Sequence, residues 1–290
     1  MSQTLAERTT HFDPANMKAG SCSADMFLGS ESARATALAG YRQSGYLIVD
    51  DVFSETELAR MHETWKEIAD GRKKAGNKPH ATLLMTHLSM PSIAGIVRDK
   101  RLLHCVENVL GGKVELIQSQ LMFGVPGNRG FSPHQDNFYN RPDPRDGIVA
   151  AWIALEDADE ENGCLVIFPG SHHHGLMKTH RDWVYLLSRS PDVAKSLWKL
   201  LSGTGKGKPN DSGVIERYVY AEAPAGLEPM NVVMKAGSVA FMHGDLVHYS
   251  YPNRTESRFR RSFLTNYVRT GTSFASGRLT GRIPFDVYAG

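Results

Sequence analysis

The feature that most constrains this chain is a histidine and an aspartate two residues apart, His134 and Asp136, which end the segment that starts at Phe131. On an extended strand, side chains two residues apart point to the same face. An imidazole and a carboxylate on one face can bind one metal ion. With a second histidine they form the 2-His-1-carboxylate triad that leaves open positions on non-heme Fe(II). The same tripeptide also occurs on surface strands, so its meaning depends on the residues that accompany it.

Two downstream histidines, His243 and His248, could complete such a triad. Strand periodicity does not decide between them, because they lie five residues apart. A strand-like segment rich in arginine follows, from Arg258 to Tyr267. A buried arginine beside a metal suits an anionic cosubstrate, since a guanidinium binds a carboxylate through two parallel hydrogen bonds. The residues alone leave both histidines open as the third ligand.

The two halves of the chain differ in the secondary structure that they predict. The first half favours helices: one from Glu31 to Ser44 before Gly45, one opened by the capping box of Ser54 and Glu57, and one over residues 93–109. The second half predicts short strands separated by glycine, proline and asparagine, which is typical of a β-rich barrel or sandwich. We expect these strands at residues 114–123, 148–155, 164–168, 232–234, 238–242 and 260–268.

Several motifs together resemble the phytanoyl-CoA dioxygenase family. The resemblance runs from about residue 40 to residue 267 and rests on His134-x-Asp136, Trp152, the segments 161–165 and 169–172, and His248-x-Ser250 with an arginine beyond. Members of this family are oxygenases that depend on Fe(II) and 2-oxoglutarate. The resemblance implies a β-rich α+β fold, a double-stranded β-helix (a cupin-like jelly roll) with supporting helices. It favours His248 over His243, and so implies His134, Asp136 and His248 as the catalytic metal ligands.

The family also implies an arginine that holds the far carboxylate of 2-oxoglutarate. At the family's usual spacing from the distal histidine stands Phe259, which departs from the pattern. One inserted residue in the preceding turn moves the match to Arg260, with Arg258 and Arg261 as alternatives. Arg261 should face the opposite side of the strand. We expect Arg260, together with Ser250, to bind the cosubstrate.

The strand before the His-x-Asp segment carries Gln118, Gln120 and Met122 on one face. The resemblance implies that this face looks into the active site. Met122 then falls where the cosubstrate is contacted, and Gln118, Gln120 and Trp152 fall beside the substrate. Ordinary packing inside a barrel explains each of these four residues equally well.

The reaction implied by the resemblance consumes 2-oxoglutarate and O2, releases succinate and CO2, and oxidises an unactivated C–H bond of a small molecule. Hydroxylation, desaturation and ring formation all fit. Because Asp136 stands where a halogenase needs a small residue, halogenation is not expected. Two alternatives remain: a zinc-type metal hydrolase, and a noncatalytic relative that binds a ligand on the same barrel.

The composition indicates which partners and which cellular compartment to expect. The formal net charge is only +2, and lysine and arginine are dispersed along the chain, so we expect no nucleic-acid-binding surface. The three cysteines are too few for a disulfide framework, and no long apolar run marks a signal peptide or a membrane span. We expect a cytoplasmic protein with an irregular N-terminal arm (residues 1–30) and a single dioxygenase domain (residues 31–290); the sequence does not indicate an oligomeric state.

Two further segments invite functional interpretations. The glycine- and lysine-rich residues 202–213 lack the P-loop pattern because Pro209 follows Lys208, so we expect either a lid or a simple connector there, after a helix over residues 181–201. The run of three histidines that starts at His172 cannot place all three rings on one metal from a single strand, because neighbours face opposite ways. We assign it no metal role.

Overall fold

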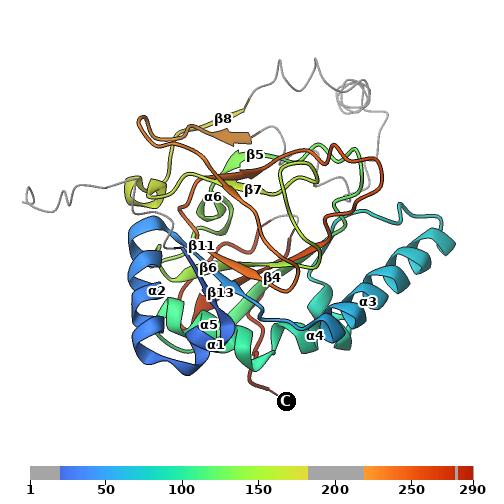
Figure 1. Ribbon diagram of the computed structural model, residues 1–290, viewed down its shortest axis with the longest axis horizontal. Coiled ribbons are helices and arrows are strands. Elements are labelled where there is room, and N and C mark those ends of the chain that lie inside the picture. The colour runs from blue at the N-terminus through green and yellow to red at the C-terminus, as the bar shows by residue number, and fades with distance from the viewer. Residues whose placement is uncertain (1–19, 182–218, 278–279, 290) are drawn as a thin grey trace, which may run out of the picture.

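Two facing β-sheets with helices packed on one side form the body of the protein (Figure 1). The computed structural model describes residues 20–181, 219–277 and 280–289. The helices are α1 (Ala24–Gly29), α2 (Glu31–Ser44), α3 (Glu55–Lys74), α4 (Pro91–Val97), α5 (Lys100–Leu110) and α6 (Asp136–Asn140), with 3-10 turns at Thr86–Leu88 and Ser171–His174.

The larger sheet has seven strands in the order β1-β2-β11-β6-β13-β4-β3, and the smaller has four in the order β10-β7-β12-β5. The first contains β1 (Ser21–Ser23), β2 (Tyr46–Asp50), β3 (Leu83–Leu84), β4 (Val114–Met122), β6 (Ile148–Ala154), β11 (Val239–His243) and β13 (Ser262–Arg269). The second contains β5 (Phe131–His134), β7 (Leu165–Ile167), β10 (Met230–Val232) and β12 (His248–Ser250), and a separate two-stranded sheet pairs β8 (Thr179–Arg181) with β9 (Val219–Ala221). This arrangement confirms the predicted β-rich α+β jelly roll.

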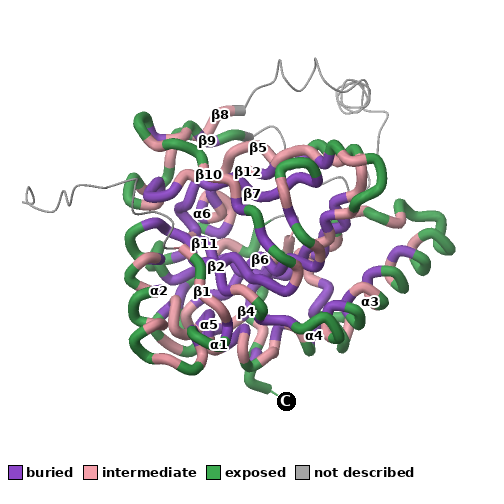
Figure 2. The backbone as a smooth tube through the Cα atoms, viewed as in Figure 1, coloured by how far each residue is buried: buried purple, intermediate pink, exposed green. Residues whose placement is uncertain are grey.

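Strand β6 shows how the fold builds two cores. Its residues alternate between the helix-facing core, which contains Val149 and Ile153, and the core between the sheets, which contains Ala150 and Trp152. Every residue of β6 is buried, because helices cover one face of the large sheet and the small sheet covers the other (Figure 2). The sequence of the strand is therefore an unbroken apolar run, and only the structure shows which residues face which core.

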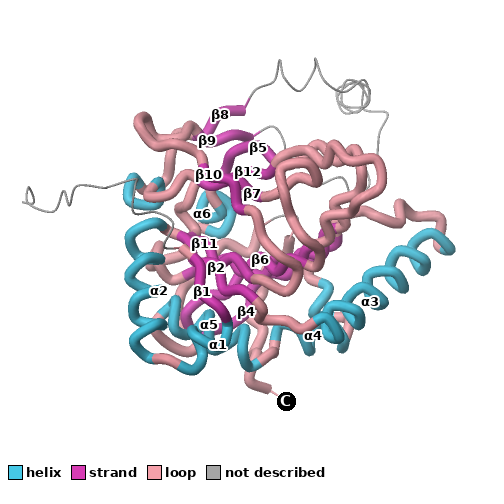
Figure 3. The backbone as a smooth tube through the Cα atoms, in the orientation of Figure 1, coloured by secondary structure: helices cyan, strands magenta, loops and turns pink. Residues whose placement is uncertain are grey.

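The predicted helix boundaries hold for the first two long helices. Gly45 adopts the left-handed conformation that ends α2, and its N–H donates to Tyr41 O. At the start of α3, Ser54 Oγ accepts from the N–H of Glu57, and the Glu57 carboxylate accepts from the N–H of Ser54. This capping box fixes the start of α3, which lies along one side of the molecule (Figure 3).

The structure corrects several expected boundaries. The single helix expected over residues 93–109 is two helices, because Asp99 caps a new start by accepting from the N–H groups of Arg101 and Leu102. The irregular arm expected up to residue 30 is wrong for residues 21–29, which form β1 and α1. Strand β13 begins at Ser262, so Arg260 precedes it instead of opening it.

The expected helix over residues 181–201 and the candidate lid over 202–213 lie outside the described residues, apart from Arg181, which ends β8. Among the described helices, none combines the length and the apolar character that a membrane crossing requires.

Candidate functional site

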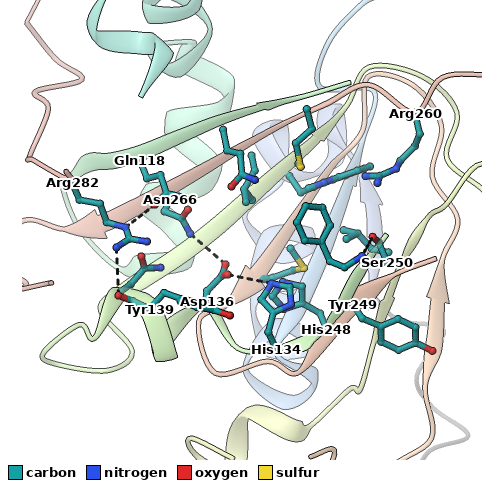
Figure 4. A pocket seen from close by; sticks show the side chains of 18 residues that line it. Gln118, His134, Asp136, Tyr139, His248, Tyr249, Ser250, Arg260, Asn266 and Arg282 are labelled. Carbon is teal, nitrogen blue, oxygen red and sulfur yellow. Dashed lines mark hydrogen bonds and ion pairs between the residues drawn. The ribbon is translucent and has the colours of Figure 1, made fainter. Parts of the chain in front are cut away.

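The pairing of β5 with β12 brings two histidines together. His134 and His248 are direct partners in the antiparallel register, and their ring centroids lie 4.2 Å apart. Side chains of directly opposed residues project to the same face of a sheet. The face that carries these two imidazoles looks into the space between the sheets, where they line a pocket (Figure 4).

Asp136 reaches the same point from the first residue of α6. The expectation that one extended strand carries both His134 and Asp136 is wrong in this detail, because β5 ends at His134. Gln135 between them is still extended, and its side chain points away and donates to the carbonyl oxygens of Gly175 and Asp245. The side chains of His134 and Asp136 therefore still point to the same side, and His134 Nε2 lies 3.9 Å from Asp136 Oδ1.

One potential ligand atom from each of His134, Asp136 and His248 lies within 4.8 Å of the other two. Both imidazoles are held by backbone carbonyls: His134 Nδ1 bonds Ser132 O at 2.7 Å, and His248 Nδ1 bonds Leu246 O at 3.0 Å. A carbonyl oxygen only accepts, so Nδ1 carries a proton, and in the neutral ring Nε2 then has the lone pair that a metal needs. Two nitrogen donors and one carboxylate at this separation fit a divalent transition metal such as Fe(II).

The three candidate arginines differ in their burial and in their partners. Arg258 pairs with Asp159 at the surface, and Arg261 pairs with Glu156 at 2.5 Å. Arg260 is only 3% exposed, lines the pocket, and places its guanidinium 5.5 Å from the Trp152 ring centroid.

The chemistry of the Arg260 side chain suits an anion. Burial lowers its pKa to about 10, so the side chain remains charged at neutral pH. Its Nε has no hydrogen-bond partner among the described residues. A buried charge and an unsatisfied donor are costly without a partner, and a bound carboxylate would satisfy both.

The remaining expected site residues all line the same pocket. Gln118, Gln120 and Met122 project inward from β4, as the alternation predicted, and Trp152 does so from β6. Ser250 lines the pocket from β12 in the smaller sheet, and its Oγ accepts from the N–H of Phe131 at 3.1 Å (Figure 4).

A known protein family matches most of the chain. The family model described as phytanoyl-CoA dioxygenase (PhyH) matches residues 41–262. The chain belongs to the phytanoyl-CoA dioxygenase family.

Individual relatives match parts of the chain. The phytanoyl-CoA dioxygenase domain-containing protein 1 of Danio rerio is 32% identical over 166 residues, which cover 54% of this chain and 48% of the relative. The phytanoyl-CoA dioxygenase of Arabidopsis thaliana is 31% identical over 159 residues, covering 53% and 44%. The chain thus spans about half the length of the curated relatives it matches.

A solved structure supports the fold. The non-heme epimerase from nogalamycin biosynthesis, in complex with Fe3+, alpha ketoglutarate and nogalamycin RO, is similar with a TM-score of 0.60. The match covers 84% of this chain and 86% of that structure at 19% sequence identity. At this identity the similarity shows a shared jelly roll.

The structure adds pocket residues that the family motifs did not indicate. Asn266 on β13 donates from Nδ2 to Asp136 Oδ2 at 3.4 Å and so orients a candidate ligand. Arg282, from the segment after β13, enters the far end of the pocket (Figure 4). The inward alternation of β13 could have revealed Asn266, but no sequence pattern marked Arg282. The other lining residues are Phe131, Tyr139, Asn140, Leu165, Met242, Tyr249 and Leu264.

His243, the alternative third ligand, does not line this pocket. Its Nδ1 accepts from the N–H of Asp245 at 3.0 Å, and its ring centroid lies 5.0 Å from that of His172. Burial lowers the pKa of His243, which favours the neutral ring. The histidine run that starts at His172 packs against the end of α2. His172 Nε2 bonds Arg42 O, and His173 Nε2 bonds Gln43 O.

Proposed function

We propose that this protein is a non-heme oxygenase that depends on Fe(II) and 2-oxoglutarate and oxidises a small molecule. The observation that carries the proposal is the shared pocket of the triad His134, Asp136 and His248 with the buried Arg260. A metal site alone fits many reactions. A metal site with a buried cation nearby fits a cosubstrate that binds the metal at one end and carries a carboxylate at the other.

His134, Asp136 and His248 would hold the iron on one side and leave its other positions toward the pocket. When bound, iron with 2-oxoglutarate and O2 supplies an oxidation of an unactivated C–H bond, with release of succinate and CO2. The protein's own contribution is to bind and orient the reactants and to keep bulk water away. Asn266 would help to hold the iron, since its amide fixes the direction of the Asp136 carboxylate.

Arg260 and Ser250 would bind the far carboxylate of 2-oxoglutarate, and Met122 would pack against its carbon chain. The guanidinium offers parallel donors, and the Ser250 hydroxyl can donate while it accepts from the N–H of Phe131. The Trp152 ring beside Arg260 limits how far this side chain can swing. These contacts would select a dicarboxylate of defined length.

Gln118, Gln120 and Trp152 would contact the substrate. The pocket lies between the two sheets and is lined by apolar side chains with a few polar groups, as small-molecule sites usually are, and the cosubstrate must share it. A small substrate is therefore supported, and a bound nucleic acid is not, because the net charge is only +2.

We also propose that residues 31–290, together with β1 and α1, act as one catalytic unit in a reducing compartment such as the cytoplasm. Cys22, Cys105 and Cys164 are all free thiols. Burial raises the pKa of Cys105 to about 12, so this thiol stays protonated and unreactive.

Anaerobic titration of the Fe(II)-loaded protein with 2-oxoglutarate tests the proposal. We expect a metal-to-ligand charge-transfer absorbance on addition of 2-oxoglutarate and, after admission of O2, formation of succinate. A Zn(II)-loaded sample is the matched control and should give neither signal. Absence of 2-oxoglutarate binding to the Fe(II) protein, or hydrolysis of an ester panel by the Zn(II) protein, would favour the hydrolase or noncatalytic alternatives.

A further inference from the structure

The turn between β11 and β12 contacts both segments that carry the candidate metal ligands. This turn comprises residues 244–247, and His248 follows it directly. Its Leu246 carbonyl oxygen bonds Nδ1 of the His248 imidazole at 3.0 Å. The same turn binds the residues on both sides of Asp136, more than a hundred positions earlier in the chain. It therefore joins the carboxylate ligand to the distal histidine.

The carboxylate ligand needs such a support, because its own helix is short. Asp136 is the first residue of α6, which has only five residues. A helix of this length is not stable by itself in water, so contacts with the rest of the protein must fix its position. Asn266 orients the Asp136 carboxylate through a hydrogen bond of 3.4 Å, but this contact does not hold the backbone of α6.

The residues that flank Asp136 are both bonded to the backbone of the turn. The N–H of Asn137 donates to Gly244 O at 2.8 Å, and Nε2 of Gln135 donates to Asp245 O at 2.6 Å. The two segments approach so closely that a Cβ atom at position 244 would lie 2.0 Å from Oδ1 of Asn137. Glycine at this position therefore permits the direct contact between the turn and the start of α6.

The Asp245 carboxylate adds a charged contact between the same two segments. It is buried, its Oδ1 accepts from Nδ2 of Asn137 at 2.8 Å, and its Oδ2 accepts from Nη2 of Arg145 at 2.8 Å. Hydrogen bonds to a charged acceptor are stronger than those between neutral groups. Loss of the carboxylate would leave the buried Asn137 amide with a donor that has no partner, which costs free energy.

We infer that Asp245 is a positioning residue for the metal site. It holds Asn137, and through it the backbone of Asp136, at a fixed place relative to the two imidazoles. The inference rests on the proposed function, which takes His134, Asp136 and His248 to be the metal ligands. Asp245 is not among the described residues that line the pocket, so its effect must pass through residues that are. Without this support, Asp136 would be held less precisely and the metal less tightly.

Titration of the full-length apoprotein with Co(II) tests the inference. The visible absorbance of bound Co(II) reports the arrangement of the ligands as well as the affinity. Asp245→Ala should bind Co(II) about tenfold or more weakly than the unmodified protein, with a changed absorption spectrum. Asp245→Asn keeps an oxygen that can accept from Asn137, so it should recover most of the affinity and the original spectrum.

Asn137→Ala removes the other partner of the same hydrogen bond and should reproduce the loss. Because the two residues act through one contact, the double variant Asp245→Ala/Asn137→Ala should bind Co(II) little more weakly than either single variant. If Asp245→Ala fails to fold, Asn137→Ala decides.

Asp99→Ala is the control for a general loss of stability. Asp99 caps α5, which packs in the helix-facing core on the other side of the large sheet from the pocket. Loss of this cap should lower the midpoint of urea unfolding and leave the Co(II) affinity and spectrum unchanged. A residue that only stabilises the fold would behave as Asp99 does.

Three results would overturn the inference: an unchanged Co(II) affinity and spectrum in Asp245→Ala or Asn137→Ala, losses that multiply in the double variant, or an equal loss of affinity in Asp99→Ala. An unmodified protein that binds neither Co(II) nor Fe(II) is a different outcome, since it would overturn the proposed function itself and the inference with it.

Discussion

His134 and His248 face each other across the β5–β12 pairing, with ring centroids 4.2 Å apart. Residues more than a hundred positions apart in the chain are thereby held by one strand register. A slip of one residue would turn one imidazole to the opposite face and disassemble the site.

The third ligand can be identified by metal content. His248→Ala removes a nitrogen donor from the triad, so we expect the purified variant to lose most of its iron. His243→Ala is the matched control, because that ring lies outside the pocket and should leave iron content unchanged. Iron retained in His248→Ala and lost in His243→Ala would reverse the assignment.

Arg260→Ala should weaken 2-oxoglutarate binding by about tenfold or more, because charged hydrogen bonds contribute roughly 1.5–3 kcal/mol each. Arg261→Ala removes the neighbouring guanidinium, which pairs with Glu156, and should leave binding nearly unchanged. Charge-transfer absorbance during anaerobic titration measures both affinities. Equal affinities in the two variants would refute the one-residue insertion that selects Arg260.

Asn266→Ala should weaken iron binding by about tenfold to a hundredfold, because it removes the amide that orients Asp136. Thr265→Val is the control. The Thr265 hydroxyl donates to Ala151 O and contacts no candidate ligand, so this variant should keep its affinity for iron. Competition with a chromogenic chelator measures the difference, and equal affinities would show that Asn266 does not support the metal.

Protonation of His172 should destabilise the protein in mild acid. Burial, aided by the nearby rings of His173 and His243, lowers the pKa of His172 to about 3. An unfolded histidine titrates near 6.5, so between about pH 6.5 and pH 3 the unfolded chain binds more protons. The free energy of unfolding should therefore fall as the pH decreases through this range.

Urea unfolding at several pH values measures that slope. His172→Gln removes the titrating group, and Gln can still donate to Arg42 O, so its slope should be shallower. His174→Gln changes an exposed neighbour and should keep the original slope. An unchanged slope in His172→Gln would assign the acid sensitivity to other groups.

The sequence by itself determined the elements with strong local signals. Gly45 ended α2 and the Ser54–Glu57 capping box opened α3, because both depend on backbone conformation and on contacts within a few residues. The family motifs likewise indicated the jelly roll and, through the two-residue alternation, the inward face of Gln118, Gln120 and Met122. The split at Asp99 was missed, because the apolar positions on either side of it still fit one helix.

Only the tertiary structure decided which residues of separate segments meet. Strand pairing placed His248 opposite His134, and burial separated Arg260 from the ion-paired Arg258 and Arg261. The backbone pairing of Phe285 with Leu116 holds the segment that carries Arg282 beside the pocket, and no local pattern could indicate this pairing. The physical reason is that local propensities act over a few residues, whereas a pocket is assembled by the packing of strands distant in sequence.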